Sequence, residues 1–381
     1  MLLYYHGTVK IEVLIMGFKC GIVGLPNVGK STLFTALSNF PVERANFPFC
    51  TIEPNKGIVP LEDRRLIQVG EIVGAQKITP ATLTMIDIAG LIKGASKGEG
   101  LGNRFLANIR EMDLLLHVVR GFYSPDVPHL TGNPSPRRDI EIVELELILA
   151  DLAVLEKRLD RTAKSLRGGS KELLREKSIL EQLVQHLNDG KPVRSFPVDT
   201  GDRELIKSWQ LLTEKPVIFV VNIGEESLES NDYQAVIEET REVAEEREAP
   251  YLSICASLEV EMLSLEDGEK EFFLQEYGVK ESGLSKVTRL GYSCLDLLTF
   301  FTIKGKETRA WPVKKGATAR EGAGKVHSDM ERGFIAAEVI QWQELLHAGS
   351  LAMARERGIL RLEGKDYLVQ DGDVISFRFN I

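Results

Sequence analysis

The chain alternates short apolar runs with longer segments whose apolar residues recur every three or four positions. Apolar runs of four to eight residues predict buried strands of a parallel sheet, and the periodic segments between them predict helices. Strands separated by helices indicate an α/β fold with a doubly wound sheet. The predicted strands lie at 20–23, 84–90, 114–119 and 215–221.

A different pattern occupies the stretch from Asp139 to Trp209, which has little strand character. Its apolar residues repeat with the spacing of three and four that is typical of a coiled-coil seam. Residues 166–170 interrupt this pattern, so we predict two antiparallel helices that form a coiled-coil hairpin. The exposed charges of such an arm form either a solvated face or a binding surface. The seam residues are Leu145, Ile148, Leu152, Leu155 and Leu159, then Leu173, Leu180, Leu183 and Leu187.

Residues 24–31, GLPNVGKS, fit the pattern G-x-x-x-x-G-K-[ST] directly after the predicted strand 20–23 and before a predicted helix at 32–37. In such a P-loop, backbone N–H groups and the positive end of the helix dipole surround phosphates. Lys30 would contact the terminal phosphates, and the Ser31 hydroxyl would bind Mg²⁺. An accidental glycine loop would not have this context. The expected nucleotide contacts are Asn27, Val28, Gly29, Lys30, Ser31 and Thr32.

The strand at 84–90 ends in the pattern D-x-x-G. Asp87 would hold Mg²⁺ through water, and the Gly90 N–H would contact the γ-phosphate. Between this motif and the P-loop, residues 46–54 are too rich in proline for regular structure. Thr51 in that segment is the candidate for a second hydroxyl on Mg²⁺, and a solvent-facing loop threonine is the alternative.

Residues 90–106 resemble the glycine-rich switch II of Obg-type P-loop proteins, and residues 45–55 resemble their switch I. The match is to the YchF group of Obg-like ATPases, in the TRAFAC class, and it covers Met16 to Ile381. The resemblance implies a C-terminal TGS domain, a small β-grasp fold found in proteins that contact RNA or the ribosome. It also implies a Mg²⁺-dependent ATPase.

The segment Asn222-Ile223-Gly224-Glu225 follows the strand at 215–221, where GTPases carry N-K-x-D. Ile223 replaces the lysine that packs over the base, and the longer Glu225 would crowd or miss the two guanine donors. An Asn222 amide can instead donate to N7 and accept from N6 of adenine. This form resembles the N-x-x-E pattern of the YchF group, which favours ATP; a loop without base preference is the alternative. Ile223 would offer its backbone and an apolar surface to the ring, and Ala256 and Ser257 would form the last base-contacting loop.

Ras-type GTPases place a water-orienting glutamine directly after D-x-x-G, but Leu91 stands at that position here. Hydrolysis is therefore expected to be slow or to depend on another polar group. Asn27 resembles that of potassium-dependent relatives, so K⁺ is a possible cofactor. His129 is a candidate catalytic residue if its loop closes on the γ-phosphate, and an ordinary surface residue is the alternative. His117, inside a buried strand, is expected to be structural.

The 381 residues carry a net charge of −9 and only four cysteines, which are scattered. This pattern argues against a zinc site and favours reduced thiols in a cytoplasmic protein. No apolar run approaches the roughly 20 residues that a membrane span requires. The basic character is local, because residues 304–325 hold seven Lys or Arg and two acids, a net charge of +5. That stretch indicates contact with a phosphate backbone or a solvated face.

The C-terminal region shows paired strands at 299–303 and 308–313, and residues 367–377 predict a hairpin with a turn at Asp371-Gly372. Residues 1–15 are expected to be an unstructured extension or a non-native start. The expected domains are a nucleotide-binding domain at 16–138 and 210–295, the helical insertion at 139–209 and a TGS domain at 296–381.

The expected function is that of a switch protein that binds and slowly hydrolyses ATP, with GTP binding more weakly. Its expected partner is the ribosome, through the large subunit and rRNA, and neither DNA nor a membrane. A ribosome-associated GTPase remains an alternative within the same class. A binding module with nucleotide as a static structural ligand is an alternative from a different class.

Overall fold

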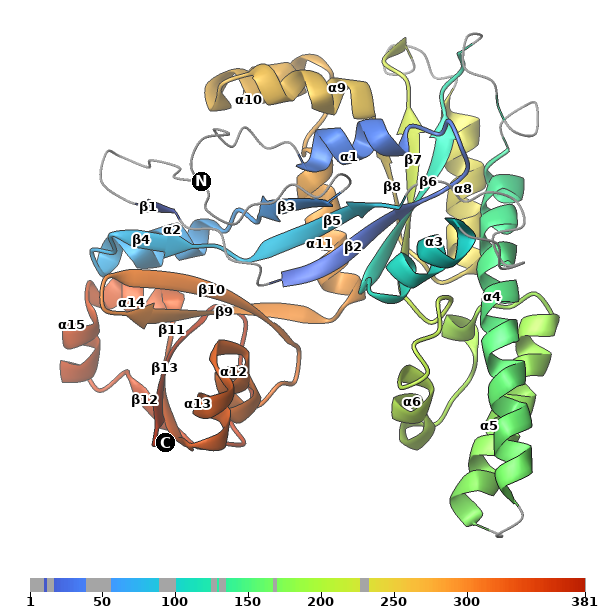
Figure 1. Cartoon of the computed structure of the whole chain (residues 1–381). Helices are drawn as coiled ribbons and strands as arrows, with labels where there is room; N and C mark the ends of the chain where they lie inside the picture. The colour runs from blue at the N-terminus through green and yellow to red at the C-terminus, as the bar shows by residue number, and fades with distance from the viewer. Residues whose placement is uncertain are drawn as a thin grey trace.

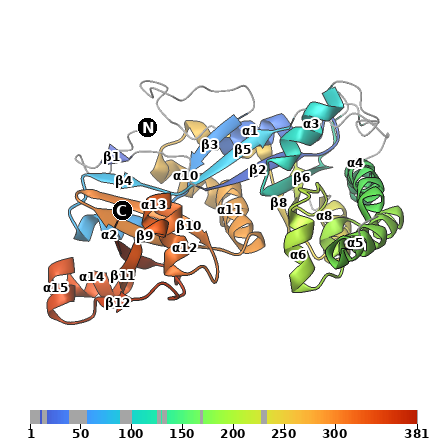
Figure 2. The same ribbon diagram turned by 60° about the horizontal axis from the view of Figure 1, so that its bottom comes forward.

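The structure is a computed structural model of the whole chain, shown in Figure 1. It describes residues 10–11, 17–38, 56–88, 101–124, 129, 135–166, 170–226 and 233–380. The nucleotide-domain sheet with its helices lies between a projecting helical arm on one side and a C-terminal domain on the other (Figures 1 and 2). Within the described ranges, no helix combines the length and apolar character needed to cross a membrane.

The first part contains a six-stranded sheet in the order β3-β5-β2-β6-β7-β8. Only β3 (Lys56–Pro60) runs antiparallel to its neighbour, β5 (Thr82–Asp87). Two adjacent interior strands, β6 and β7, consist of buried residues throughout, as expected for parallel strands covered on two faces. The predicted α/β fold is therefore confirmed. The remaining strands are β2 (Gly17–Val23), β6 (Leu114–Gly121), β7 (Val217–Ile223) and β8 (Tyr251–Ile254).

Helices connect these strands and pack against the sheet (Figure 1). The largest core cluster joins residues of β2, β5, β6 and β7 to residues of the surrounding helices. At Gly291, an added Cβ would lie 2.7 Å from the Phe18 ring, so this helix approaches the sheet too closely for a larger residue. The helices are α1 (Lys30–Ser38), α2 (Arg64–Ile72), α3 (Leu101–Arg110), α8 (Gln234–Glu246), α9 (Ala256–Glu261), α10 (Asp267–Glu276) and α11 (Gly283–Cys294).

The arm consists of α4 (Pro136–Ser165) and α5 (Lys171–Asn188), which lie side by side in Figures 1 and 2. With 30 residues, α4 is about 45 Å long. A separate core cluster joins Leu155 and Leu183 to Trp209, so the return segment with α6 (Thr200–Lys207) also packs on the arm. The predicted hairpin is confirmed, but Leu145 is 51% exposed and lies outside the seam. Close to the nucleotide domain, α4 packs against other elements as well as α5. The heptad pattern therefore does not decide which face of α4 is buried there.

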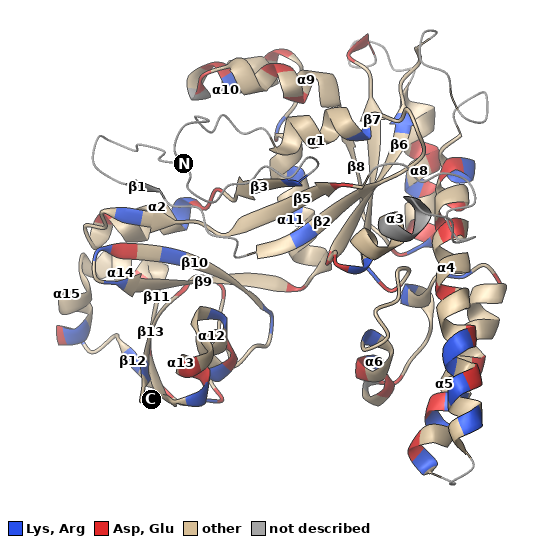
Figure 3. Cartoon of the chain, viewed as in Figure 1, with Lys and Arg blue, Asp and Glu red and all other residues tan. Residues whose placement is uncertain are grey.

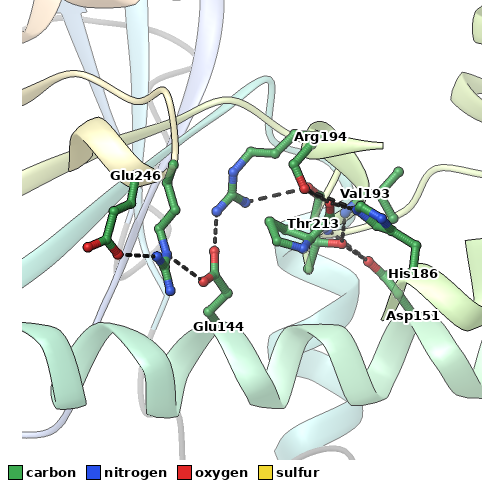
Figure 4. A network of polar contacts seen from close by, with 10 residues as sticks. Glu144, Asp151, His186, Val193, Arg194, Thr213 and Glu246 are labelled. Carbon is green, nitrogen blue, oxygen red and sulfur yellow. Dashed lines mark hydrogen bonds and ion pairs between the residues drawn. The ribbon is translucent and has the colours of Figure 1, made fainter. Parts of the chain in front are cut away.

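A network of polar contacts holds the root of the arm (Figure 4). The carboxylate of Asp151 accepts hydrogen bonds from the backbone N–H groups of Leu212 and Thr213, both at 2.8 Å, and from the Thr213 hydroxyl. Glu144 pairs with Arg194 and Arg247. Since these partners belong to the return segment and to the end of α8, α4 is joined to both neighbouring parts of the chain.

In the C-terminal domain, α12 (Ala319–Val326) packs against a mixed sheet, and this arrangement fits a β-grasp fold. Its antiparallel hairpin of β9 (Leu297–Lys304) and β10 (Glu307–Lys314) confirms the predicted strand pair. The predicted hairpin at 367–377 is wrong. Gly372 turns the chain with φ 84°, but β13 (Asp373–Phe379) pairs with β11 (Phe334–Gln341) and β9, whereas Leu368 forms one isolated bridge with Thr318. The other elements are α13 (Ser328–Arg332), α14 (Trp342–Ala348), α15 (Leu351–Glu356) and β12 (Arg361–Glu363).

The sheet of the C-terminal domain extends into the first part of the chain. Its order is β1-β4-β10-β9-β13-β11-β12, and β4 (Lys77–Thr79) comes from the segment just before β5. Arg65 strengthens this junction through ion pairs with Asp63 and Asp371. The short strand β1 (Lys10–Ile11) pairs with β4. The expectation that residues 1–15 are unstructured is therefore wrong for these two residues, because β4 offers them a free sheet edge; the other thirteen lie outside the described ranges.

Candidate nucleotide-binding site

The P-loop connects the end of β2 to the start of α1, as its sequence pattern predicts. Asn27 has φ 62° and Gly29 has φ 91°, two left-handed conformations that turn the backbone sharply. At Gly29, an added Cβ would lie only 2.1 Å from Nδ2 of Asn222. Glycine is therefore required here for two reasons, the backbone angle and the close approach of β7.

Lys30 opens α1, and its ammonium group donates a hydrogen bond to the Leu25 carbonyl at 2.6 Å. Burial lowers the pKa of Lys30, and the nearby charge of Asp87 acts in the opposite direction. The ammonium thus lies within the P-loop itself, bonded to one of the loop's own carbonyls. An incoming phosphate would offer a stronger, charge-assisted partner at the same place.

Ser31, in the first turn of α1, meets Asp87 at the carboxyl end of β5. The Ser31 hydroxyl donates to Oδ2 of Asp87 at 2.8 Å, whereas Oδ1 of Asp87 is buried and has no hydrogen-bond partner within the described part of the chain. A buried carboxylate oxygen without a partner is costly unless a cation or water satisfies it. One hydroxyl and one carboxylate with spare acceptor capacity fit Mg²⁺, which prefers oxygen ligands and keeps several waters.

Three predicted site residues lie in segments outside the described residues, namely Thr51, Gly90 and Leu91. Their predicted roles stay predictions. Among the P-loop residues, the Val28 side chain is buried and Thr32 is exposed on the first turn of α1. Any contact of Val28 with nucleotide would therefore come from its backbone.

Asn222 ties three loops together at the carboxyl end of β7. Its Nδ2 donates to the Val28 carbonyl at 3.0 Å, and its Oδ1 accepts from the Ala256 N–H at 3.2 Å. The side chain is buried. The predicted reading of adenine by this amide stays a prediction, but the structure adds a function that sequence reasoning missed: Asn222 positions the P-loop against the other two loops.

The neighbouring residues of the base-recognition loop differ in exposure. The Ile223 side chain packs in a core cluster with Cys255 and Leu258. The expectation that it offers an apolar surface to the base is therefore wrong, because β7 is covered on both faces up to its last residue. Glu225 is exposed, and the Ser257 hydroxyl lies 3.3 Å from Sγ of Cys255.

Phe122 is a site candidate that the sequence analysis did not identify. A Cβ added at Gly29 would lie 3.9 Å from its ring, which places this aromatic side chain beside the P-loop. The guanidinium of Arg120 lies 4.5 Å from the centre of the same ring, and its Nε donates to the Phe122 carbonyl. The only signal in the sequence was an aromatic residue directly after a buried strand.

The two histidines considered from sequence both prove to be buried. His117 on β6 is packed 5.5 Å from the Phe219 ring, and burial lowers its pKa to about 3. The His129 side chain is 2% exposed, with Nε2 2.9 Å from Oδ2 of Asp139. Its interpretation as an ordinary surface residue is therefore wrong, whereas its catalytic role stays a prediction.

Two protein-family models match this chain, one near its N-terminus and one at its C-terminus. A family model described as 50S ribosome-binding GTPase covers residues 19–148, and the model YchF-GTPase_C, described as a protein of unknown function, covers residues 297–380. "Ribosome-binding ATPase YchF" of Pasteurella multocida (strain Pm70) is 49% identical over 366 residues, which are 96% of this chain and 100% of that protein. This chain belongs to the YchF family.

Other YchF proteins agree over the same length. The proteins of that name from Escherichia coli O157:H7 and Bacillus subtilis (strain 168) are each 46% identical over 366 residues, with 96% of this chain and 100% of each relative covered. The solved structure of the Schizosaccharomyces pombe YchF GTPase matches with a TM-score of 0.84 and 32% identity, covering 97% of this chain and 100% of that one. The fold is thus shared along nearly the whole chain.

Proposed function

We propose that this YchF-family chain binds Mg²⁺–ATP at its P-loop, hydrolyses it slowly and contacts the ribosome through the arm and the C-terminal domain. The observation that carries the proposal is the meeting of Ser31 and Asp87, with one oxygen of Asp87 free of hydrogen-bond partners in the described chain. This pair supplies a place for Mg²⁺ beside the phosphate loop. Relatives that are 46–49% identical carry the name ribosome-binding ATPase.

In the proposed site, Lys30 exchanges its bond to the Leu25 carbonyl for the β- and γ-phosphates. Backbone N–H groups of the P-loop and the start of α1 hold the remaining phosphate oxygens. Bound Mg²⁺ would neutralise charge on the β- and γ-phosphates, with Ser31, Asp87 and, as a further proposal, Thr51 as its protein contacts. Gly90 is proposed to contact the γ-phosphate through its N–H.

The proposed preference for adenine rests on the residues that we expect to lie near the base. Ile223 has no charged group to place over a ring, and its side chain is buried. Glu225 carries a longer carboxylate than the aspartate that reads guanine. Phe122 supplies an aromatic face next to Gly29, and an aromatic face can stack on a purine. We therefore expect ATP to bind at least tenfold more tightly than GTP, a difference of about 1.4 kcal/mol.

Slow turnover is proposed because Leu91 cannot orient water. We propose His129 as the group that assists hydrolysis, and K⁺ near Asn27 as a second contribution to charge stabilisation. Turnover without a partner should then lie well below the value of about 10 s⁻¹ that is typical of enzymes. Replacing K⁺ by Na⁺ should lower turnover further if the cation takes part.

The test is calorimetric titration with ATP and with GTP in the presence of Mg²⁺, followed by phosphate release with and without ribosomes. Equal affinities, or tighter binding of GTP, would contradict the adenine preference. Glu225→Asp should shift the preference towards GTP, and because Glu225 is exposed this change leaves the core intact. Exposed Glu156→Asp on α4 is the matched control and should change neither affinity.

A GTPase is the second candidate, because the model matching residues 19–148 and the solved yeast relative are both described as GTPases. The same titration decides between the two nucleotides. Ribosome binding that is independent of nucleotide, together with no measurable phosphate release, would instead indicate a binding module with a static ligand.

The proposed ribosomal contact is with rRNA of the large subunit. The exposed lysines of the C-terminal hairpin lie at its two ends, with Lys304 and Lys306 at the turn and Lys314 and Lys315 at the far end. Figure 3 shows how basic and acidic residues are distributed over the elements. An eight-residue strand such as β10 spans about 26 Å, so the two pairs form separate basic points. Two such points favour contact with an extended phosphate backbone.

A further inference from the structure

Lys215 lies between the carboxyl end of α3 and the start of β7. Its ammonium group donates a hydrogen bond to the Arg110 carbonyl at 2.9 Å and another to the Met112 carbonyl. Arg110 is the last residue of α3, and Met112 lies in the short connection to β6. A cation is favourable at the end of a helix, where the last carbonyl groups have no partner within the helix. Lys215 therefore fastens the end of α3 to the segment that leads into β7.

The residues just before Lys215 are held by the arm. Asp151 of α4 accepts hydrogen bonds from the backbone N–H groups of Leu212 and Thr213 and from the Thr213 hydroxyl (Figure 4). All three of these residues are buried. Only Glu214 lies between Thr213 and Lys215. The contact with the arm and the contact with α3 therefore belong to one short stretch of backbone.

Met112, on the other side of Lys215, packs next to the metal-side aspartate. Ile88 follows Asp87 in the chain, and the side chains of Ile88 and Met112 are 1% and 2% exposed. A Cβ added at Gly21 of β2 would lie 2.7 Å from Cδ1 of Ile88 and 2.8 Å from Cγ of Met112, so the two side chains meet over this glycine. In a closely packed core, a displacement of one such side chain passes to its neighbours.

These contacts form a continuous path from the nucleotide site to the arm. The path runs from Asp87 through the packed side chains of Ile88 and Met112 to the ammonium group of Lys215, and from there along the backbone to Asp151. Glu144 joins the arm to the end of α8, whereas Lys215 joins it to the residues next to the metal-side aspartate.

The chemistry of Lys215 suits a link that moves as one piece with α3. Burial lowers the pKa of its ammonium group, while nearby carboxylates, first that of Asp113, act in the opposite direction. A partly buried ammonium group that loses a carbonyl partner leaves a charged donor unsatisfied, which is costly. The end of α3 and Lys215 are therefore expected to shift together and to keep their hydrogen bonds.

We propose that Lys215 couples the nucleotide site to the root of the arm, an inference that rests on the proposed binding of Mg²⁺–ATP beside Asp87. With Mg²⁺–ATP bound, Asp87 and the adjoining Ile88 are held in place, and Met112 with them. Lys215 carries this constraint to the arm. Coupling between two sites is reciprocal. A partner that holds the arm therefore changes the affinity for nucleotide by the same factor by which nucleotide changes the affinity for that partner.

The test is amide hydrogen exchange at the root of the arm, residues 143–155, with and without Mg²⁺ and the β,γ-imido analogue of ATP. In the parent, the saturating analogue should slow exchange at the P-loop and, by about fivefold, at the root of the arm, the lower end of the range for coupled sites. Lys215→Met keeps the aliphatic chain but has no donor. In this variant the P-loop should respond as in the parent, and the root of the arm should not respond.

The matched control is Lys207→Met, at an exposed position on α6 where the lysine pairs with exposed Glu204. This variant should keep the response of the parent. Lys215→Gln is made in parallel, because its amide is too short to reach both carbonyl groups and the same loss is expected. It keeps the test in place if thermal unfolding shows that Lys215→Met has lost its structure.

The outcomes separate this inference from the proposed function. A root of the arm that responds to the analogue in folded Lys215→Met or Lys215→Gln as it does in the parent would overturn the coupling through Lys215. Protection of the P-loop in the parent with no response at the root of the arm would also overturn it, and the proposed binding of ATP would stand. If the analogue does not protect the P-loop of the parent, the proposed function fails and the inference fails with it.

Discussion

Glu144 on α4 and Arg247 at the end of α8 form an ion pair with 2.9 Å between Oε2 and Nε. The other carboxylate oxygen of Glu144 pairs with Arg194 on the return segment of the arm. Glu144 is 7% exposed, so these contacts are largely shielded from water. One carboxylate thereby joins the arm, its return segment and the nucleotide domain (Figure 4).

Glu144→Gln should loosen the root of the arm. Removing one partner of a shielded ion pair leaves the other charges without compensation, which costs about 2 kcal/mol or more. Amide hydrogen exchange over residues 143–155 should accelerate accordingly. Glu156→Gln removes an exposed charge from the same helix and should leave exchange unchanged. Unchanged protection in Glu144→Gln would show that apolar packing alone holds the arm.

Gly29→Ala should abolish tight nucleotide binding. The added Cβ would meet Nδ2 of Asn222 at 2.1 Å, and φ 91° strains any L side chain, so the P-loop and β7 must separate. The affinity for ATP, measured by calorimetry, should fall by about tenfold or more. Gly305→Ala is the control, since it has φ 61° but nothing within 4 Å. Parent-like affinity in Gly29→Ala would contradict the requirement for glycine.

Phe122→Ala should weaken nucleotide binding by about 1–3 kcal/mol, the range for loss of one stacked base. The reason is that the ring lies beside Gly29 and is held by Arg120. The neighbouring Tyr123 is 84% exposed, so Tyr123→Ala provides a matched loss of an aromatic side chain. Equal affinities of the two variants for ATP would remove Phe122 from the site.

His117 should make the protein less stable as the pH falls below neutral. Burial lowers the pKa of His117 in the folded state to about 3, whereas the unfolded chain takes up the proton near pH 6.5. Between these values only the unfolded state is protonated, so stability is lost as the pH falls. From pH 7 to pH 5 the loss amounts to about 2 kcal/mol.

The measurement is denaturant unfolding across this pH range. His117→Leu should flatten the dependence on pH, and His327→Leu, at an exposed position, should not. A parent-like slope in His117→Leu would assign the pH dependence to other groups.

Changing Lys304, Lys306, Lys314 and Lys315 to Ala should weaken co-sedimentation with ribosomes and reduce its salt dependence, because fewer counterions are released. Since the two pairs lie at opposite ends of β9–β10, each double variant reports on one end. ATP affinity should not change. Binding equal to that of the parent across a salt series would identify these lysines as a solvated face.

The P-loop and the central strands could be predicted because their signals are local. Residues 24–31 carry the glycines, the lysine and the serine in one short segment, between a strand and a helix that each show their own period. The strands β6 and β7 are buried along their whole length, so their sequences are apolar without interruption. The helical insertion was visible for the same reason.

Contacts between distant segments required the folded chain. Asn222 meets Val28 across 194 residues, and no periodicity records that approach. The hairpin at 367–377 was predicted from a strand pattern with an Asp-Gly turn, but the pattern does not say which strand is the neighbour, and β13 pairs with β11 and β9 instead.

The fold class, the P-loop motif, the D-x-x-G motif that begins at Asp87 and the presence of an arm could be read from the sequence alone, because each depends on the chemistry of adjacent residues. Only the tertiary structure decided that Leu145 is exposed, that Ile223 faces the core and that His129 is shielded beside Asp139. Burial and pairing depend on which surfaces meet. An apolar or polar residue signals only that it can take part in such a contact, and the long-range packing selects its partner.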